Sequence, residues 1–215
     1  MYCIFHLPRC GSHYLHSLLN TSLSLLNPIH MKDDIEPFNP AFNTTQSIQE
    51  KYQEFISRTP HPVVKMVINH YPELAENFLS HPGYTTLFIK PKNYRKRLLK
   101  ALVEKHFKTY SGGSDRKKVR EPFIGTLEFS DELIRERFVH YTIHMKYENR
   151  CDYVFYDEDI FQNPQNIQTM FNLPVTIPKY KRVAPFYDDE IMLVSKEQFN
   201  VQYERISQEI LGEII

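Results

Sequence analysis

The chain has 215 residues, of which 41% are hydrophobic, and this length is enough to bury the core of one domain. Its 26 basic and 26 acidic side chains give a formal net charge of zero. No overall electrostatic field therefore favours nucleic acid or a membrane surface as a partner, and any anion site must be local.

Cysteine content and hydropathy bear on the compartment. The chain has 3 cysteines and no Cys-x-x-Cys pair, which is typical of reduced thiols rather than of a disulfide scaffold. No apolar stretch approaches the roughly 20 residues that a membrane-spanning helix needs. Residues 1–5 already form a strand pattern instead of a signal sequence. We therefore expect one cytoplasmic domain over residues 1–215.

The first part of the chain predicts a buried strand, a turn and a helix. Met1–Phe5 is a short apolar run suited to a strand that is buried on both faces of a sheet. Leucines then recur at three- and four-residue spacing, which predicts an amphipathic helix that begins near Gly11 or Ser12 and ends before Pro28.

The turn between this strand and this helix predicts an anion site. A strand that enters a helix through a tight turn directs free backbone N–H groups outward, and Arg9 adds a fixed positive charge. The Gly-x-x-x-x-Gly-Lys-Ser/Thr pattern of nucleoside-triphosphate loops is absent, and no lysine precedes Ser12. Mg²⁺-dependent hydrolysis of ATP or GTP is therefore disfavoured.

The middle of the chain alternates strands and helices. The β-branched run Val63–Ile68 is typical of an interior strand, and it places His70 at the carboxyl end, where open parallel sheets bind ligands. An imidazole at that position can accept a proton near neutral pH. The other expected elements are a loop over 28–45, helices over 47–58 and 73–79, a strand over 85–89 and a basic helix from Lys90 towards Tyr110.

The second half continues this order. The expected elements are a flexible charged loop over 111–120, a helix over 130–149 with Ser130 as N-cap, a strand over 151–156 and a helix over 188–211. Asp157, Glu158 and Asp159 follow the last strand, and such consecutive carboxylates usually cap a helix rather than bind a metal. The order of elements predicts an α/β fold, a three-layer sandwich with a central, mainly parallel sheet.

The first turn also carries a family resemblance. Leu7-Pro-Arg-Cys-Gly-Ser-His-Tyr-Leu15 resembles the Pro-Lys/Arg-Ser-Gly-Thr-Thr-x-Leu loop of sulfotransferases that use 3′-phosphoadenosine 5′-phosphosulfate (PAPS). In that family the P-loop-like loop wraps the 5′-phosphosulfate of the donor. The resemblance therefore implies that the donor-binding residues here are Arg9, Cys10, Gly11, Ser12, His13 and Tyr14, with Arg9 in place of the basic residue and Gly11 matching the glycine.

Later segments resemble further elements of the same family. His70-Tyr71-Pro72 matches a His-x-Pro element whose histidine removes the proton of the acceptor hydroxyl. Lys90-Pro91-Lys92 resembles the strand end that holds the donor's 3′-phosphate, and Arg97 falls at the register of a family serine. Tyr156–Pro164 resembles a Tyr-Glu-Asp-Leu-x-x-x-Pro element, and the pair Lys181 and Arg182 resembles a basic segment that also reaches the 3′-phosphate.

Taken together, the resemblance implies a sulfotransferase that moves a sulfuryl group from PAPS to a hydroxyl or amine of a small-molecule or glycan acceptor, with Arg9 and His70 as catalytic residues and no metal. Two alternatives remain. A P-loop-type kinase would need a Mg²⁺-binding carboxylate and a loop lysine. A degenerate nucleotide-binding or interaction protein without catalysis is favoured by His13 and by the absence of a serine between Ser80 and Ser111.

Overall fold

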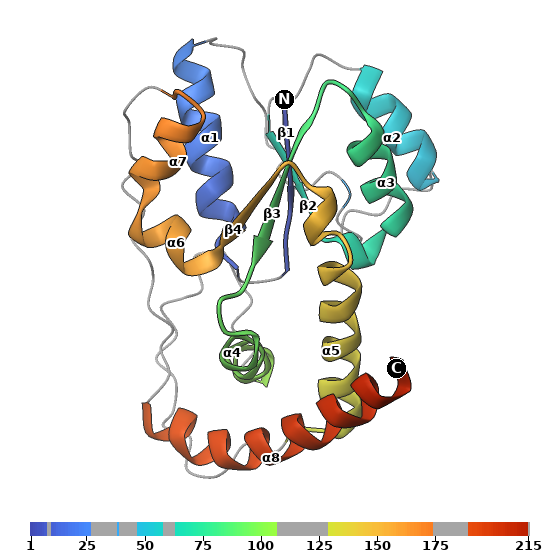
Figure 1. The fold of residues 1–215 in the computed structure, drawn as a ribbon, viewed down its shortest axis with the longest axis vertical. Coiled ribbons are helices and arrows are strands. Elements are labelled where there is room, and N and C mark those ends of the chain that lie inside the picture. The colour runs from blue at the N-terminus through green and yellow to red at the C-terminus, as the bar shows by residue number, and fades with distance from the viewer. Residues whose placement is uncertain are drawn as a thin grey trace. The chain divides into compact units, whose positions relative to one another are not determined.

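The computed structural model describes residues 1–7, 10–26, 38, 47–57, 63–106, 129–173 and 189–214. The chain divides into two compact units, the first made of Met1–Lys92 and Thr142–Lys181 and the second of Asn93–Tyr141 and Arg182–Ile215. Figure 1 shows the elements of both units. The loop expected over 111–120 lies outside the described residues, as does all of the loop expected over 28–45 except Phe38. The assignment of one domain to the whole chain stays a prediction.

The first unit is built on a parallel sheet. Four strands lie in the order β2-β1-β3-β4, and every pair of neighbours is parallel. Because the strands are parallel, all four carboxyl ends meet at one edge of the sheet. The strands are β1 (Tyr2–Phe5), β2 (Val63–Met66), β3 (Thr85–Lys90) and β4 (Tyr153–Tyr156).

Side chains of the sheet alternate between two cores. Cys3, Phe5 and Phe88 pack with α2 and α3 on one face, whereas Ile4 and Leu87 pack with α1, α6 and α7 on the other. The three layers of helix, sheet and helix in Figure 1 confirm the predicted α/β sandwich. The helices are α1 (Ser12–Leu26), α2 (Ile48–Ser57), α3 (Pro72–Ser80), α6 (Asp157–Gln162) and α7 (Pro164–Met170).

A pair of polar side chains fixes the start of β4 against β3. The Asp152 carboxylate accepts hydrogen bonds from the Thr86 backbone N–H at 2.6 Å and from the Thr86 hydroxyl at 2.8 Å. The Asp152 N–H donates back to Thr86 Oγ1 at 3.1 Å. These bonds set the register that brings Tyr156 opposite Lys90 at the far end of the same two strands.

The second unit contains helices only, within the residues described. Its core joins α4 (Tyr94–His106), the first part of α5 (Asp131–Met145) and α8 (Asp189–Ile214). The Tyr94 ring stacks on Tyr141 with a centroid separation of 3.8 Å, and its hydroxyl donates to the Arg137 carbonyl at 2.5 Å. The predicted basic helix thus begins at Tyr94 and not at Lys90, which is the last residue of β3.

Side-chain caps decide where two helices begin. Ser47 and Glu50 form a reciprocal capping box before α2, with Ser47 N to Glu50 Oε2 at 2.9 Å and Glu50 N to Ser47 Oγ at 3.2 Å. Ser130 Oγ accepts the Leu133 N–H at 3.3 Å, which confirms the predicted N-cap of α5. This helix ends at Met145, earlier than predicted, and a 3₁₀ turn over Glu148–Arg150 (η4) follows it.

His144 is fully buried at the end of α5. Its Nε2 lies 3.0 Å from the Ile89 carbonyl oxygen, and its ring stacks on Phe88 at a centroid separation of 4.1 Å. Because a carbonyl only accepts hydrogen bonds, Nε2 carries the proton. Burial, and to a smaller extent repulsion from the nearby His6, lower the pKa of His144 to about 3, against the hydrogen bond with the Ile89 carbonyl, which raises it.

This buried imidazole predicts that the fold loses stability in mild acid. Above the pKa of an unfolded histidine, about 6.5, both states are neutral, and below it only the unfolded chain binds the proton. The free energy of unfolding should fall by about 1.4 kcal/mol per pH unit as the pH drops from 6.5 towards the folded pKa. Urea unfolding at several pH values measures this slope, which His144→Gln should reduce.

The control for this measurement is His81→Gln, at a partly exposed histidine whose Nδ1 accepts the Gly83 N–H. This variant should keep the slope of the unchanged protein. Identical slopes in the unchanged protein and His144→Gln would show that another group takes up the proton.

Candidate functional site

The first turn and His70 follow the carboxyl ends of two neighbouring strands, β1 and β2. β1 pairs with β2, and the His6 N–H continues that pairing by donating to the Met66 carbonyl at 3.1 Å. β2 ends at Met66, two residues earlier than predicted, and a 3₁₀ turn over Ile68–His70 (η2) follows. The His70 side chain is exposed in that turn. The structure thus confirms that His70 follows the carboxyl end of a strand beside β1.

Gly11 is the backbone pivot of the first turn. Its φ angle is +82°, in the left-handed region that side chains rarely adopt, and its carbonyl accepts the N–H groups of Tyr14 at 2.9 Å and Leu15 at 3.2 Å. A Cβ at Gly11 would lie 2.7 Å from Cε2 of Phe161. The Tyr14 ring stacks on the same Phe161 at 5.3 Å. Glycine is therefore required by its backbone angle and by its contact with α6.

The residues around Gly11 turn their side chains in different directions. Cys10 is fully buried, and its thiol donates to the Leu7 carbonyl at 2.8 Å, while His6 Nδ1 lies 3.0 Å from the same oxygen. Ser12 and Tyr14 are buried, whereas His13 is exposed. Of the predicted loop residues, Cys10 therefore offers only its backbone to a ligand in this arrangement. Arg9 lies outside the described residues.

The helix that follows this turn suits an anion at its first turn. α1 begins at Ser12 and has no acidic residue in its first turn. The positive end of the helix dipole is therefore not offset by a carboxylate of its own helix. A left-handed Gly11 directly before the start of α1 is compatible with the anion site that the sequence predicted, and that site stays a prediction.

Lys90, predicted to bind a phosphate, has a carboxylate partner. Its ammonium forms an ion pair with Glu148 of η4 and lies 4.7 Å from the ring centroid of Tyr156. Only 18% of the Lys90 side chain and 21% of the Glu148 side chain are exposed. The hydrogen bond that the ammonium donates to Glu148 raises the pKa of Lys90, so the ammonium stays charged. Sequence reasoning missed Glu148, because no local pattern links residues so far apart in the chain.

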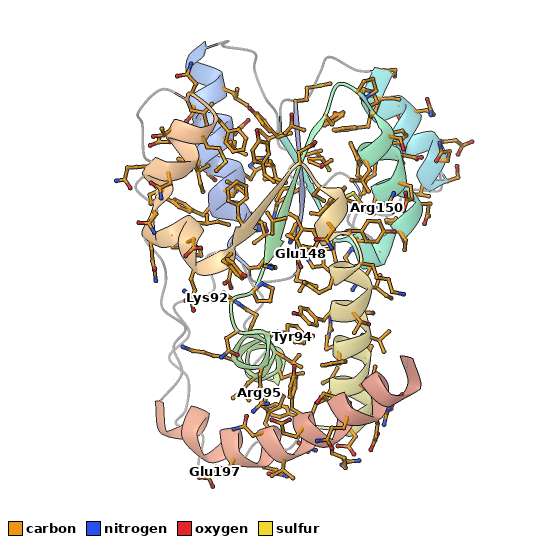
Figure 2. The ribbon with its side chains drawn as sticks, viewed as in Figure 1. Lys92, Tyr94, Arg95, Glu148, Arg150 and Glu197 are labelled. Atoms are coloured by element: carbon orange, nitrogen blue, oxygen red, sulfur yellow. The ribbon has the colours of Figure 1, made fainter. Side chains whose placement is uncertain are left out.

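Lys92 and the acidic residues after β4 also meet at this edge. The buried carboxylate of Asp157 accepts the Lys92 backbone N–H at 3.1 Å, and Lys92 Nζ lies 4.0 Å from Glu158 Oε2. Figure 2 labels Lys92 just beyond β3. The three carboxylates do occupy the first turn of α6, as predicted, but the side chain of the N-cap residue, Tyr156, makes no capping hydrogen bond. Asp157 instead links the ends of β3 and β4.

The other predicted phosphate ligands are distributed as follows. Arg97 belongs to α4 of the second unit, where its side chain is half-buried and its N–H donates to the Asn93 carbonyl at 3.1 Å. Lys181 and Arg182 lie outside the described residues. In the described part of the chain, no three His, Cys, Asp or Glu side chains gather as a metal site. No helix among those same residues is long and apolar enough to cross a membrane.

Gly11 yields a prediction for the turn. Gly11→Ala should lower the free energy of unfolding by about 2–4 kcal/mol, because the alanine must adopt a left-handed backbone and displace the Phe161 ring. Urea unfolding measures the loss. Gly83→Ala is the matched control, since Gly83 has no left-handed φ and its Cβ would meet the flexible end of Met1 at 3.0 Å. Equal losses at the two glycines would contradict a special conformation at Gly11.

Comparisons with models of protein families, with curated proteins and with solved structures find no match to this chain.

Proposed function

We propose that the protein is a sulfotransferase that carries a sulfuryl group from PAPS to a hydroxyl or amine of a small molecule or glycan. The observation that carries this proposal is the left-handed Gly11 between the end of a central parallel strand and the start of α1. A strand that enters a helix through a tight turn presents backbone N–H groups at the start of the helix, as phosphate-binding turns require. The resemblance of residues 7–15 to the family's donor loop supplies the identity of the anion.

In this proposal each residue of the site has a separate role. Backbone amides of residues 10–13 hold the 5′-phosphate, and Arg9 neutralises the sulfuryl and bridging oxygens. The Tyr14 N–H, also predicted to contribute, already donates to the Gly11 carbonyl. His70 accepts the proton of the acceptor as the acceptor oxygen or nitrogen forms its bond to sulfur. The bond between sulfur and the bridging oxygen breaks, and adenosine 3′,5′-bisphosphate leaves with the electron pair. Support for this geometry comes from the adjacent positions of β1 and β2.

The proposed 3′-phosphate ligands are Lys90, Arg97, Lys181 and Arg182. We also propose a cytoplasmic location, which the absence of a Cys-x-x-Cys pair supports.

A second candidate is a degenerate nucleotide-binding or interaction protein without catalysis. The observation in its favour is the ion pair between Lys90 and Glu148, because the cation proposed for the 3′-phosphate already has a carboxylate partner. A screen of hydroxylated glycans, phenols and amines with labelled donor distinguishes the two candidates. Transfer to any acceptor supports the enzyme, whereas nucleotide binding with no transfer supports the second candidate.

The donor site is tested by calorimetry with adenosine 3′,5′-bisphosphate, with ATP as the comparison ligand. The bisphosphate should bind, and Arg9→Ala should weaken it by about 2 kcal/mol, roughly 30-fold, because a charged contact in a partly desolvated site is lost. Lys146→Ala, at an exposed lysine after α5, is the control and should bind as before. The same affinity in Arg9→Ala as in the unchanged protein would remove the loop from the proposed site.

The base is tested by turnover. His70→Ala should lower the rate of transfer by roughly 10²–10⁴-fold, while the affinity for the bisphosphate stays within about twofold. The rate of the unchanged protein should also fall below the pKa of the imidazole, since a protonated ring cannot accept the proton, and His70→Ala should lack that limb. His81→Ala serves as control, because His81 lies between α3 and β3, at the opposite edge of the sheet. Transfer at the unchanged rate by His70→Ala would end this assignment.

A further inference from the structure

The ion pair at the end of β3 is set within three elements of the first unit. Lys90 ends β3, Glu148 lies in η4, and Tyr156 ends the neighbouring strand β4. The Lys90 ammonium lies 4.7 Å from the Tyr156 ring centroid while it pairs with the Glu148 carboxylate. Both charged side chains are about four-fifths buried, at 18% and 21% exposure, so water screens their attraction less than at an open surface.

A second ion pair holds the same short helix in place. Arg150 donates two hydrogen bonds of 2.6 Å to Glu76 of α3, and its guanidinium lies 5.3 Å from the Tyr147 ring centroid. Figure 2 labels Glu148 and Arg150 of η4. Glu148 pairs with Lys90 of β3, whereas Arg150 pairs with Glu76 of α3. Glu148 is therefore presented to Lys90 by a turn that is anchored independently of Lys90.

Other carboxylates reinforce the negative charge at this edge. Lys92 has Glu158 at 4.0 Å, and its backbone N–H is taken by Asp157. Among these described residues the two lysine side chains thus pair with Glu148 and Glu158, and Asp157 adds a third carboxylate at this edge. A phosphate that binds Lys90 must share its ammonium with Glu148 or displace that carboxylate, and in both cases the carboxylate repels the phosphate from close range.

We propose that Glu148 is a specificity-determining residue, which lowers the affinity of the protein for nucleotides with a 3′-phosphate by holding Lys90. This inference rests on the proposed function, which assigns the 3′-phosphate of the donor to Lys90. Without Glu148, Lys90 would favour nucleotides that carry a 3′-phosphate over those that lack it more strongly than it does when paired. The Tyr156 ring keeps the ammonium at the strand end when the carboxylate is neutralised, so the cation stays available to the ligand.

The experiment compares the binding of adenosine 3′,5′-bisphosphate and of adenosine 5′-monophosphate by calorimetry. Glu148→Gln should raise the affinity for the bisphosphate about tenfold and change the affinity for the monophosphate less than about twofold, because only the first ligand reaches Lys90. Addition of Lys90→Met to Glu148→Gln should abolish the gain. Glu209→Gln is the matched control, since it removes the carboxylate of an ion pair with Arg135 on other elements and should leave both affinities unchanged.

The outcomes separate this inference from the proposed function. Equal changes for the two ligands in Glu148→Gln, or no change for either, overturn the role of Glu148 even when both nucleotides bind. Failure of both ligands to bind both the unchanged protein and Glu148→Gln overturns the proposed function as well. Thermal unfolding verifies that each variant is folded, and Glu148→Asp, which shortens the side chain but keeps its charge, should give a smaller gain in the same direction.

Discussion

β1 pairs in parallel with β2 on one side and β3 on the other, and the rest of the first unit depends on this pairing. Because the strands run in one direction, three segments far apart in sequence leave the sheet at the same edge. These segments are the turn at Gly11, the turn at His70 and the strand end at Lys90. The central strand pairs with a neighbour on each side, so its carboxyl end is held from both sides.

The helix that follows β1 is fixed to this edge by packing. Tyr14 stacks on Phe161 of α6, and the same ring occupies the space where a Cβ of residue 11 would lie. α6 itself begins where Asp157 links the ends of β3 and β4 through the Lys92 N–H. The conformation of the first turn therefore depends on a helix almost 150 residues later, through contacts that need glycine at position 11.

The electrostatic environment differs between two places on the carboxyl edge of the sheet, the turn at Gly11 and the end of β3. The turn at Gly11 and the start of α1 offer N–H groups without a nearby acidic residue in the helix. The end of β3 offers two lysines, each matched by carboxylates of η4 and α6. An anion is therefore favoured at the first position and must compete with Glu148 at the second. This difference is the physical reason why the two phosphates of the proposed donor are considered separately.

The alternation of strands and helices, the helix start near Ser12 and the Ser130 cap could be predicted from the sequence, because apolar periodicity and capping chemistry are local. The sequence placed His70 at a strand end for the same reason. Local patterns did not predict where the basic helix begins, because Lys90 belongs to β3 through its pairing with β4. Three features could not be predicted and follow from the packing of the fold: the ion pair of Lys90 with Glu148, the hydrogen bond from the Lys92 N–H to Asp157, and the burial of His144. These contacts join residues that no periodicity relates, so the packed sheet had to bring them together.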